Sequence, residues 1–127
     1  MNYGITDSTG AALDLDPQAF VSSVRERWPG QVTREVLSPG GINLCTIEIE
    51  PANSDAFQIF LLGPETQVST EGTDQQALEV AAWVRSLLPD ELPSEVWFFD
   101  EGFTGHAVLT PGITPDGIKL AWHEHHS

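Results

Sequence analysis

Apolar residues recur at helical spacing near the start of the chain. Phe20, Val21, Val24 and Trp28 follow one another at steps of one, three and four residues, which places them on one side of a helix. An aspartate and a proline stand directly before them, and these residue types favour the cap and the first turn of a helix. The pattern predicts a helix over Pro17–Trp28.

A longer apolar stripe predicts a second helix over Asp74–Leu88. Thr73 and Gln76 have the spacing of a capping box, and Pro89 ends the pattern. Trp83 lies off the main stripe, so we expect it either to make a second contact face or to be an exposed anchor. The residues of the stripe are Ala77, Val80, Ala81, Val84, Leu87 and Leu88.

A third helix is predicted over Pro115–His125. Thr114 and Pro115 repeat the combination of a capping residue and a first-turn proline. The residues expected on its inner face are Ile118, Ala121, Trp122 and His125.

Strand patterns fill the segments between these helices. Ala56–Leu62 is apolar at almost every position, which favours a central strand covered on both faces, whereas Thr66–Thr70 is expected to be a short edge strand. Residues 1–15 are rich in Gly, Ser, Thr and Asp, and we expect them to be loosely held. The other predicted strands are Val32–Leu37, Ile42–Glu50, Val96–Phe99 and Thr104–Leu109.

This order of elements predicts one α+β domain over residues 1–127. The order is α-β-β-β-(β)-α-β-β-α, and the short turns between strands favour antiparallel pairing. We therefore expect an antiparallel-dominated sheet of five or six strands, covered by about three helices.

The net charge restricts the partners that such a domain can bind. Five Lys and Arg stand against 19 Asp and Glu, which gives a formal charge of −14. A field of this sign repels nucleic acid and anionic membrane surfaces, and it attracts basic proteins. Hydrophobic residues make up 40% of the chain, which is too many for a disordered acidic segment.

Cysteine content and hydropathy favour a cytoplasmic protein. Cys45 is the single cysteine, so it cannot form an intramolecular disulfide, and we expect it to be a small buried hydrophobe on a strand. The first residues lack the basic and apolar regions of a secretory signal, and no stretch approaches about 20 apolar residues, the length of a membrane span.

Two groups of residues could carry chemistry, and neither favours an enzyme. His123 and His126 lie three apart and could clasp a metal ion on a helix, but a terminal segment lacks the surrounding support that fixes ligands. Asp100 and His106 supply a carboxylate and an imidazole, the groups of general acid–base catalysis, without an accompanying nucleophile pattern. We expect no metal site, no cofactor and no catalytic residue.

An acidic stretch with aromatic residues predicts a docking surface instead. After Arg85 the only Lys or Arg is Lys119. Aromatic side chains are frequent anchors of protein interfaces, and complementary charge speeds association. Half of Val96–Phe99 should still point into the core. The predicted partner-binding residues are Asp90, Glu91, Glu95, Trp97, Asp100, Glu101 and Phe103.

The segment from Glu95 to Ile118, which includes EVWFFDEGFTGHAVL, resembles the C-terminal part of small acidic proteins of actinobacterial type. In size and charge the whole chain also resembles the immunity proteins that neutralise bacterial polymorphic toxins. The resemblance implies a non-enzymatic inhibitor whose acidic face covers a basic site on a toxin. Two other hypotheses stay open: a small-ligand-binding or enzymatic domain that uses the region of Asp100 and His106, and a homodimeric structural subunit.

Overall fold

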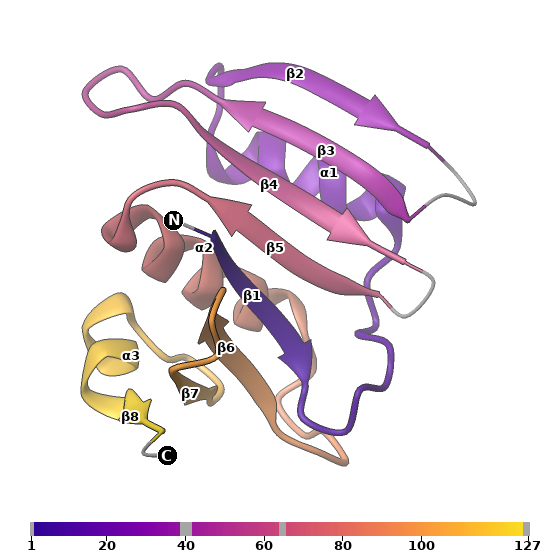
Figure 1. Cartoon of the computed structure of the whole chain (residues 1–127). Coiled ribbons are helices and arrows are strands. Elements are labelled where there is room, and N and C mark those ends of the chain that lie inside the picture. Colours follow the sequence, from indigo (N-terminus) through magenta and orange to yellow (C-terminus); the bar gives the residue numbers. More distant parts are fainter. Residues whose placement is uncertain (1, 39–41, 64–65, 126–127) are drawn as a thin grey trace.

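A computed structural model describes residues 2–38, 42–63 and 66–125 (Figure 1). The helices are α1 (Pro17–Arg27), α2 (Asp74–Leu87) and α3 (Pro115–Ala121). The strands are β1 (Asn2–Asp7), β2 (Val32–Leu37), β3 (Asn43–Ile49), β4 (Phe57–Leu62), β5 (Gln67–Glu71), β6 (Val96–Asp100), β7 (Gly105–Leu109) and β8 (His123–Glu124).

The α+β class, the antiparallel pairing and the three helices are confirmed, but the number of strands was wrong. One sheet of eight strands runs in the order β2-β3-β4-β5-β1-β6-β7-β8. The two strands that the sequence did not predict are β1 and β8, which come from the two ends of the described chain. Both lack the long apolar run that marks a strand in a sequence.

β1 contradicts the expectation that residues 1–15 are loosely held. It pairs with β5 on one side and with β6 on the other, so it lies in the middle of the sheet. Ile5 is fully buried, and the ring of Tyr3 stacks on that of Phe98 with 5.0 Å between centroids. The polar composition of this segment is misleading, because ladder hydrogen bonds on both edges hold the strand and only its inward side chains need to be apolar.

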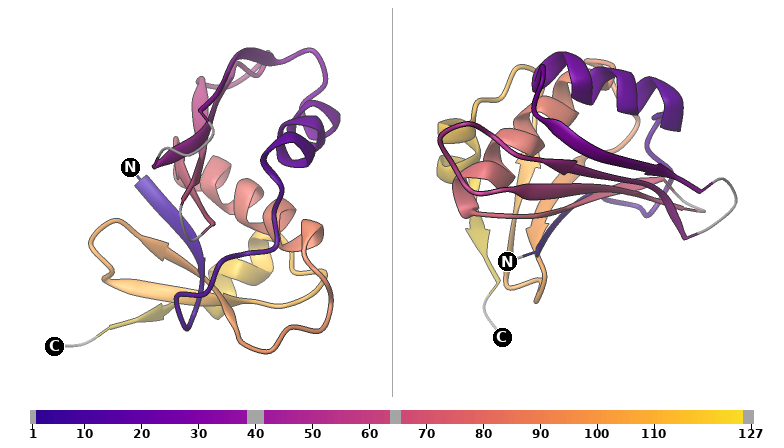
Figure 2. Two further views of the ribbon diagram at one scale, coloured as in Figure 1. Left: turned by 90° about the vertical axis from the view of Figure 1, so that its right-hand side faces the viewer. Right: turned by 90° about the horizontal axis from the view of Figure 1, so that it is seen from above.

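All three helices lie on one face of the sheet, which bends around α2 (Figure 2). This arrangement overturns two predictions. Residues Phe57–Leu62 alternate between buried and half-buried, so β4 is covered on one face only. β5 lies between β4 and β1, so it is an interior strand rather than an edge strand. An apolar run indicates a central strand, but it does not show that helices cover both faces of the sheet at that strand.

α2 forms the centre of the core. Its capping box is present: Gln76 N–H donates to Thr73 Oγ1 over 3.1 Å, and Thr73 N–H donates to Gln76 Oε1 over 2.9 Å. Of the predicted stripe only Leu87 is half-buried. The residues of the stripe that are buried are Ala77, Val80, Ala81, Val84 and Leu88.

Trp83 is buried rather than an exposed anchor. Its ring centroid lies 5.3 Å from that of Phe20 and 5.2 Å from that of Trp28. α1 therefore supplies the cover that the spacing within α2 alone could not reveal. Arg85 is also buried, and its guanidinium donates to the backbone oxygens of Leu109, Pro89 and Asp90. These bonds compensate the buried charge.

α3 is shorter than predicted and ends at Ala121, after which His123 and Glu124 pair with β7 as β8. Trp122 explains the early end. Its indole ring lies so close to Gly105 that a Cβ there would stand 2.6 Å from Nε1, and Nε1–H donates to Glu124 Oε1 over 3.0 Å. The chain is thereby turned from the helix onto the edge of the sheet.

Replacing Val84 with aspartate tests the core of α2. Because Val84 is fully buried, we expect Val84→Asp to lower the free energy of unfolding by about 3–5 kcal/mol, the cost of an uncompensated buried charge. Gln75→Asp adds the same charge at an exposed position of the same helix and should change stability little. Urea denaturation measures both variants, and equal stability would contradict this description of the core.

A methyl group at Gly4 tests the placement of β1. A Cβ there would lie 2.4 Å from Cζ of Phe99 on the neighbouring strand, so Gly4→Ala must displace that ring. We expect a loss of roughly 1–3 kcal/mol, typical of overpacking. At Gly102 the nearest atom to a new Cβ is Thr104 Cγ2 at 3.5 Å, so Gly102→Ala is a matched control. Thermal unfolding of Gly4→Ala at the wild-type temperature would show that β1 does not lie against Phe99.

Candidate functional site

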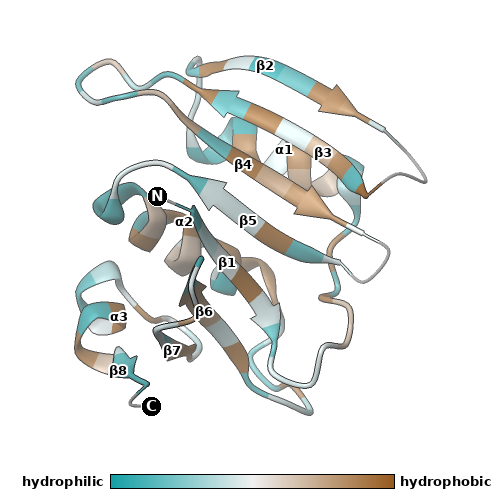
Figure 3. Cartoon of the chain, viewed as in Figure 1, coloured by the Kyte–Doolittle hydropathy of each residue, from teal (hydrophilic) through white to brown (hydrophobic). Residues whose placement is uncertain are grey.

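We call the face of the sheet opposite the helices the open face. Hydrophilic and hydrophobic residues follow one another along most of the strands (Figure 3). The buried residues of the strands, which are mostly apolar, belong to the helix side, and the residues between them belong to the open face. A single cross-strand row runs through its middle, from one edge of the sheet to the other. The residues of that row, from β2 to β8, are Val36, Thr46, Phe60, Ser69, Gly4, Phe99, His106 and His123.

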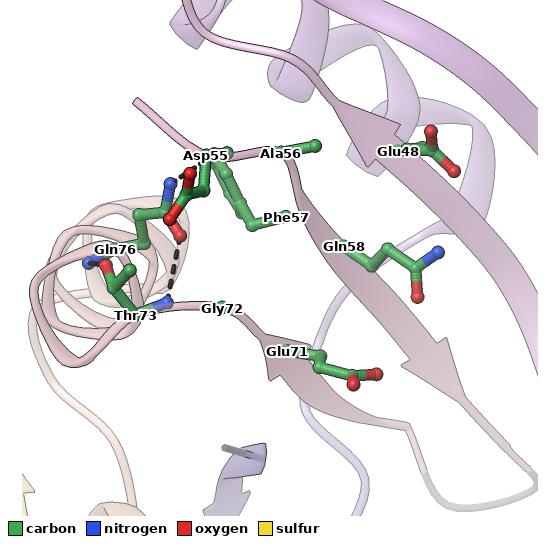
Figure 4. Close-up of a pocket in the computed structure, with 9 residues that line it drawn as sticks. All are labelled: Glu48, Asp55, Ala56, Phe57, Gln58, Glu71, Gly72, Thr73 and Gln76. Carbon is green, nitrogen blue, oxygen red and sulfur yellow. Dashed lines mark hydrogen bonds between the residues drawn. The ribbon is translucent and has the colours of Figure 1, made fainter. Parts of the chain in front are cut away.

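At one end of the open face lies an acidic hollow of about 520 Å³ (Figure 4). Glu48, Gln58 and Glu71 stand side by side in the register of β3, β4 and β5. Asp55 and Gln76 close the opposite side of the hollow. The residues that line it are acidic, neutral polar or apolar, so the hollow attracts positively charged groups.

Gln76 fixes the wall between the hollow and α2. Its side-chain amide donates to Ser54 Oγ over 3.1 Å and to Asp55 O over 2.6 Å, in addition to its part in the helix cap. Gly72 passes close to it: a Cβ there would lie 2.6 Å from Gln76 Oε1. The hollow is therefore bounded by hydrogen-bonded backbone rather than by side chains alone.

At the other end of the open face lies an aromatic–histidine cluster, made of Trp97, Phe99, Phe103, His106 and His125. The ring centroid of His106 lies 4.4 Å from that of Trp97. Phe103 packs on Phe99 at 5.6 Å and on His125 at 4.6 Å. Phe103 keeps 45% of its surface exposed, so the cluster presents an aromatic ring to solvent.

The turn between β6 and β7 places Phe103 within this cluster. Phe103 has a φ of 50°, in the left-handed region that non-glycine residues rarely adopt. Asp100 holds the turn by accepting from Thr104 N–H over 2.7 Å and from the Thr104 hydroxyl. Partial burial raises the pKa of Asp100, but these hydrogen bonds outweigh it and bring the pKa below its usual value. The carboxylate thus serves to shape the turn.

His106 and His125 form a hydrogen-bonded pair. Nδ1 of His106 lies 2.6 Å from Nε2 of His125, and Nδ1 of His125 lies 3.0 Å from the backbone oxygen of Phe103. The pKa of His106 is lowered, first by burial and then by the neighbouring His125 and His123, while Glu95 acts in the opposite direction. The environment therefore favours the uncharged imidazole at His106.

The structure brings together three of the seven predicted partner-binding residues. Trp97 Nε1–H donates to Glu95 Oε1 over 3.2 Å, and the ring centroids of Trp97 and Phe103 lie 6.3 Å apart. These three are Glu95, Trp97 and Phe103. Two further predicted residues lie in the adjoining turn: Glu101 is exposed, and Asp100 accepts a hydrogen bond from Thr104 N–H.

The remaining two predicted residues, Asp90 and Glu91, lie apart from this group. They follow α2, beside the buried Arg85, and precede β6, whereas Phe103 follows the other end of that strand. The acidic stretch is continuous in sequence, but it does not form one surface.

Asp100 and His106 also do not converge as an acid–base pair. Phe99 is the register partner of His106 on the open face, and Asp100 follows Phe99, so its position belongs to the other face of β6. The imidazole contacts His125 and the carboxylate contacts Thr104. The two groups that the enzyme hypothesis needs are each engaged elsewhere.

Sequence reasoning missed the acidic hollow and the histidine pair. The alternation within β3 does place Glu48 on the outward side, but its proximity to Glu71 depends on how β3, β4 and β5 pair. The contact between His106 and His125 depends on β8, which the sequence predicted as helix. Phe98, in contrast, points into the core, as expected for half of this aromatic run.

Among residues 2–38, 42–63 and 66–125, no group of three or more His, Cys, Asp or Glu side chains is placed to hold a metal ion. His126, which the sequence analysis considered with His123 as a possible metal clasp, lies outside the described residues. Cys45 is buried as predicted, and burial together with Glu35 raises its pKa to about 11.

Comparisons of the chain with protein-family models, curated proteins and solved structures find no significant match. The resemblance to immunity proteins therefore stays a hypothesis, and so does the expected cytoplasmic location. None of the helices in the described part of the chain has the length and apolarity needed to cross a bilayer.

Proposed function

We propose that this chain is a non-enzymatic, acidic protein-binding module that docks a basic protein on the open face of its sheet. One observation carries the proposal: an eight-stranded sheet leaves one whole face without a covering helix in the described residues, and that face holds both an acidic hollow and an exposed aromatic cluster. Charged groups steer a partner toward the face, and aromatic anchors hold it.

The positions of the basic residues support this choice of face. Arg25 pairs with Glu35, and Arg27 lies over the ring of Trp28, both on the helix side. Arg85 is buried, and Lys119 lines a hollow on the helix side. Only Arg34, opposite Glu48 in the register of β2, belongs to the open face. Most of the positive charge is thus kept away from it.

The two features of the open face complement an arginine- or lysine-rich surface. Carboxylates around a hollow accept the head groups of such side chains, and guanidinium groups also stack on aromatic rings. Glu71 on β5 lies opposite Asn2 of β1, and Trp97 on β6 lies opposite Thr6 of β1. The two are thus two strands and four residues apart, which is about 16 Å at the usual strand spacing and rise. One partner surface can therefore contact both features.

The size of the face is of the order that a stable complex needs. Eight strands at the usual spacing span about 34 Å, and five-residue strands are about 17 Å long. A footprint of these dimensions is comparable to the roughly 800 Å² that each partner buries in a standard protein interface. A small ligand would instead require a deep enclosed pocket.

The most concrete form of this proposal is an immunity-type inhibitor that covers the basic site of a bacterial toxin. The acidic charge and the resemblance noted from the sequence favour it. The candidate partner is then the product of a neighbouring gene, because immunity proteins are usually encoded beside their toxins. Association of two copies of this chain through the aromatic cluster is the competing outcome, and analytical ultracentrifugation distinguishes the two.

Matched charge variants test the docking face. We expect Glu48→Gln/Glu71→Gln to weaken binding of a basic probe, an arginine decapeptide, by roughly tenfold at low salt, because two carboxylates leave the hollow. Glu26→Gln/Asp116→Asn removes the same charge from exposed positions on α1 and α3 and should have a much smaller effect. Isothermal titration calorimetry measures both affinities.

The salt dependence supplies the control for this experiment. Ions screen exposed charges over about 8 Å at physiological ionic strength, so the difference between the two variants should shrink as salt rises. An equal loss of affinity in both variants would mean that the peptide responds only to net charge, and the open face would then not be the docking site.

A further inference from the structure

The histidine pair can hold one added proton but not two. A backbone oxygen can only accept, so His125 Nδ1 must carry the hydrogen that meets Phe103 O at 3.0 Å. The 2.6 Å contact between His106 Nδ1 and His125 Nε2 then needs one hydrogen shared by the two nitrogens. If both rings are imidazolium, both of these nitrogens carry hydrogen, and the contact becomes repulsive.

This contact holds the last strand in place. β8 has only two residues, and beyond it the backbone N–H of His125 donates to Thr104 O over 2.7 Å. The ring of His125 packs on Phe103, which itself sits in a left-handed turn. A two-residue strand at the edge of a sheet has little stability of its own, so its attachment depends on these side-chain contacts.

The other charged groups around His106 do not offset a second proton. Glu95, before β6, is the nearby carboxylate that favours the charged imidazole, while His123 on β8 opposes it. Asp100 of the turn is bound to Thr104, and Glu124 is bound to Trp122 Nε1. Arg85 of α2 and Lys119 of α3 approach from the helix-covered face.

We infer that docking on the open face is proton-linked: a second proton on the His106–His125 pair separates the segment His123–His125 from β7 and releases a basic partner. This inference rests on the proposed function only for the release; the separation is a property of the chain alone. Acidification places positive charge within the docking face and removes the support of Phe103, an exposed aromatic anchor. Both effects act against a cationic partner.

The sign of the effect on stability follows from linkage. His106 has a lowered pKa in the folded chain, so the unfolded chain binds more protons as the pH falls below the ordinary value of about 6.5. The contribution of the pair to stability is therefore complete above that pH and is lost as the pH falls through the lowered pKa. Carboxylates with ordinary pKa values near 4 stay ionised over most of this range.

Hydrogen exchange of the chain alone tests the separation. Between about pH 7.5 and about pH 5.5, where histidine titrates, we expect protection of the His125 backbone amide to fall by at least roughly tenfold after correction for intrinsic exchange. Amides of β3 and β4 should keep their protection. Retained protection at His125 while both rings become charged, as followed by NMR, would overturn the inference.

Two variants separate the hydrogen bond from the charge. His123→Gln removes another imidazole from the same strand without breaking the pair, and it should keep the pH-dependent separation. His106→Gln leaves His125 without its titrating partner, and it should abolish that pH dependence. The opposite outcome is that His123→Gln abolishes the separation as completely as His106→Gln does. General repulsion between the imidazoles of this strand and its neighbour would then cause the separation, and the His106–His125 hydrogen bond would not, which would contradict the inference.

Binding of the arginine decapeptide at both pH values tests the release. Arginine keeps its charge throughout, so a change in affinity reports on this chain. We expect binding to weaken by roughly an order of magnitude at the lower pH in the wild type and in His123→Gln, and by much less in His106→Gln. Equal affinity at both pH values despite separation of β8 would overturn the linkage, whereas absence of binding at either pH would overturn the proposed function instead.

Discussion

The open face exists because β1 joins two separate groups of strands. β2 to β5 form one antiparallel series and β6 to β8 form another, and the two series meet only through β1, which pairs with β5 and β6. Gly4 lies at the centre of this strand, and the absence of a side chain there gives Phe99 its place over the backbone. Without β1 the acidic hollow and the aromatic–histidine cluster would belong to two separate sheets.

The one-sided cover of the sheet follows from the helices. α2 is fixed at its start by the capping box and at its end by Arg85, whose bonds to Leu109 and to the following loop hold the helix against β7. α1 and α3 pack beside it on the same face (Figure 2). The outward side chains are thus left to solvent, and they include half-buried Phe60 and Trp97 and the exposed Phe103. Exposed aromatic residues on such a face are typical of surfaces that bind other proteins.

The spacing and type of neighbouring residues predicted those helices and strands whose structure depends on interactions within a single segment. The stripe of α2, the cap at Thr73 and the inward position of Cys45 were correct because spacing and residue type determine them. β1 and β8 were missed because their residues have no strand pattern and become strands only by pairing with a distant edge. The sequence left two alternatives open for Trp83 for the same reason, since the cover over it comes from Phe20 and Trp28 on another helix.

The candidate site was only partly predictable for a related physical reason. Trp97 and Phe103 come from one hairpin, so sequence proximity was a good guide to their contact. Glu48 and Glu71 come from strands separated by β4, and His106 and His125 meet across the β7–β8 edge. Side chains on one face of a sheet are neighbours by register, and register depends on the pairing of the whole sheet rather than on any single segment.

The four tryptophans offer the most direct test of the docking face. Trp97 alone lies on the open face, while Trp28, Trp83 and Trp122 pack on the helix side against Phe57, Phe20 and Phe98. The indole N–H signals of a ¹⁵N-labelled chain should therefore respond differently when a basic partner binds. We predict that the signal of Trp97 shifts during the titration and that the other three stay in place. A shift of Trp122 with no change at Trp97 would place the partner on the helix side and contradict the account.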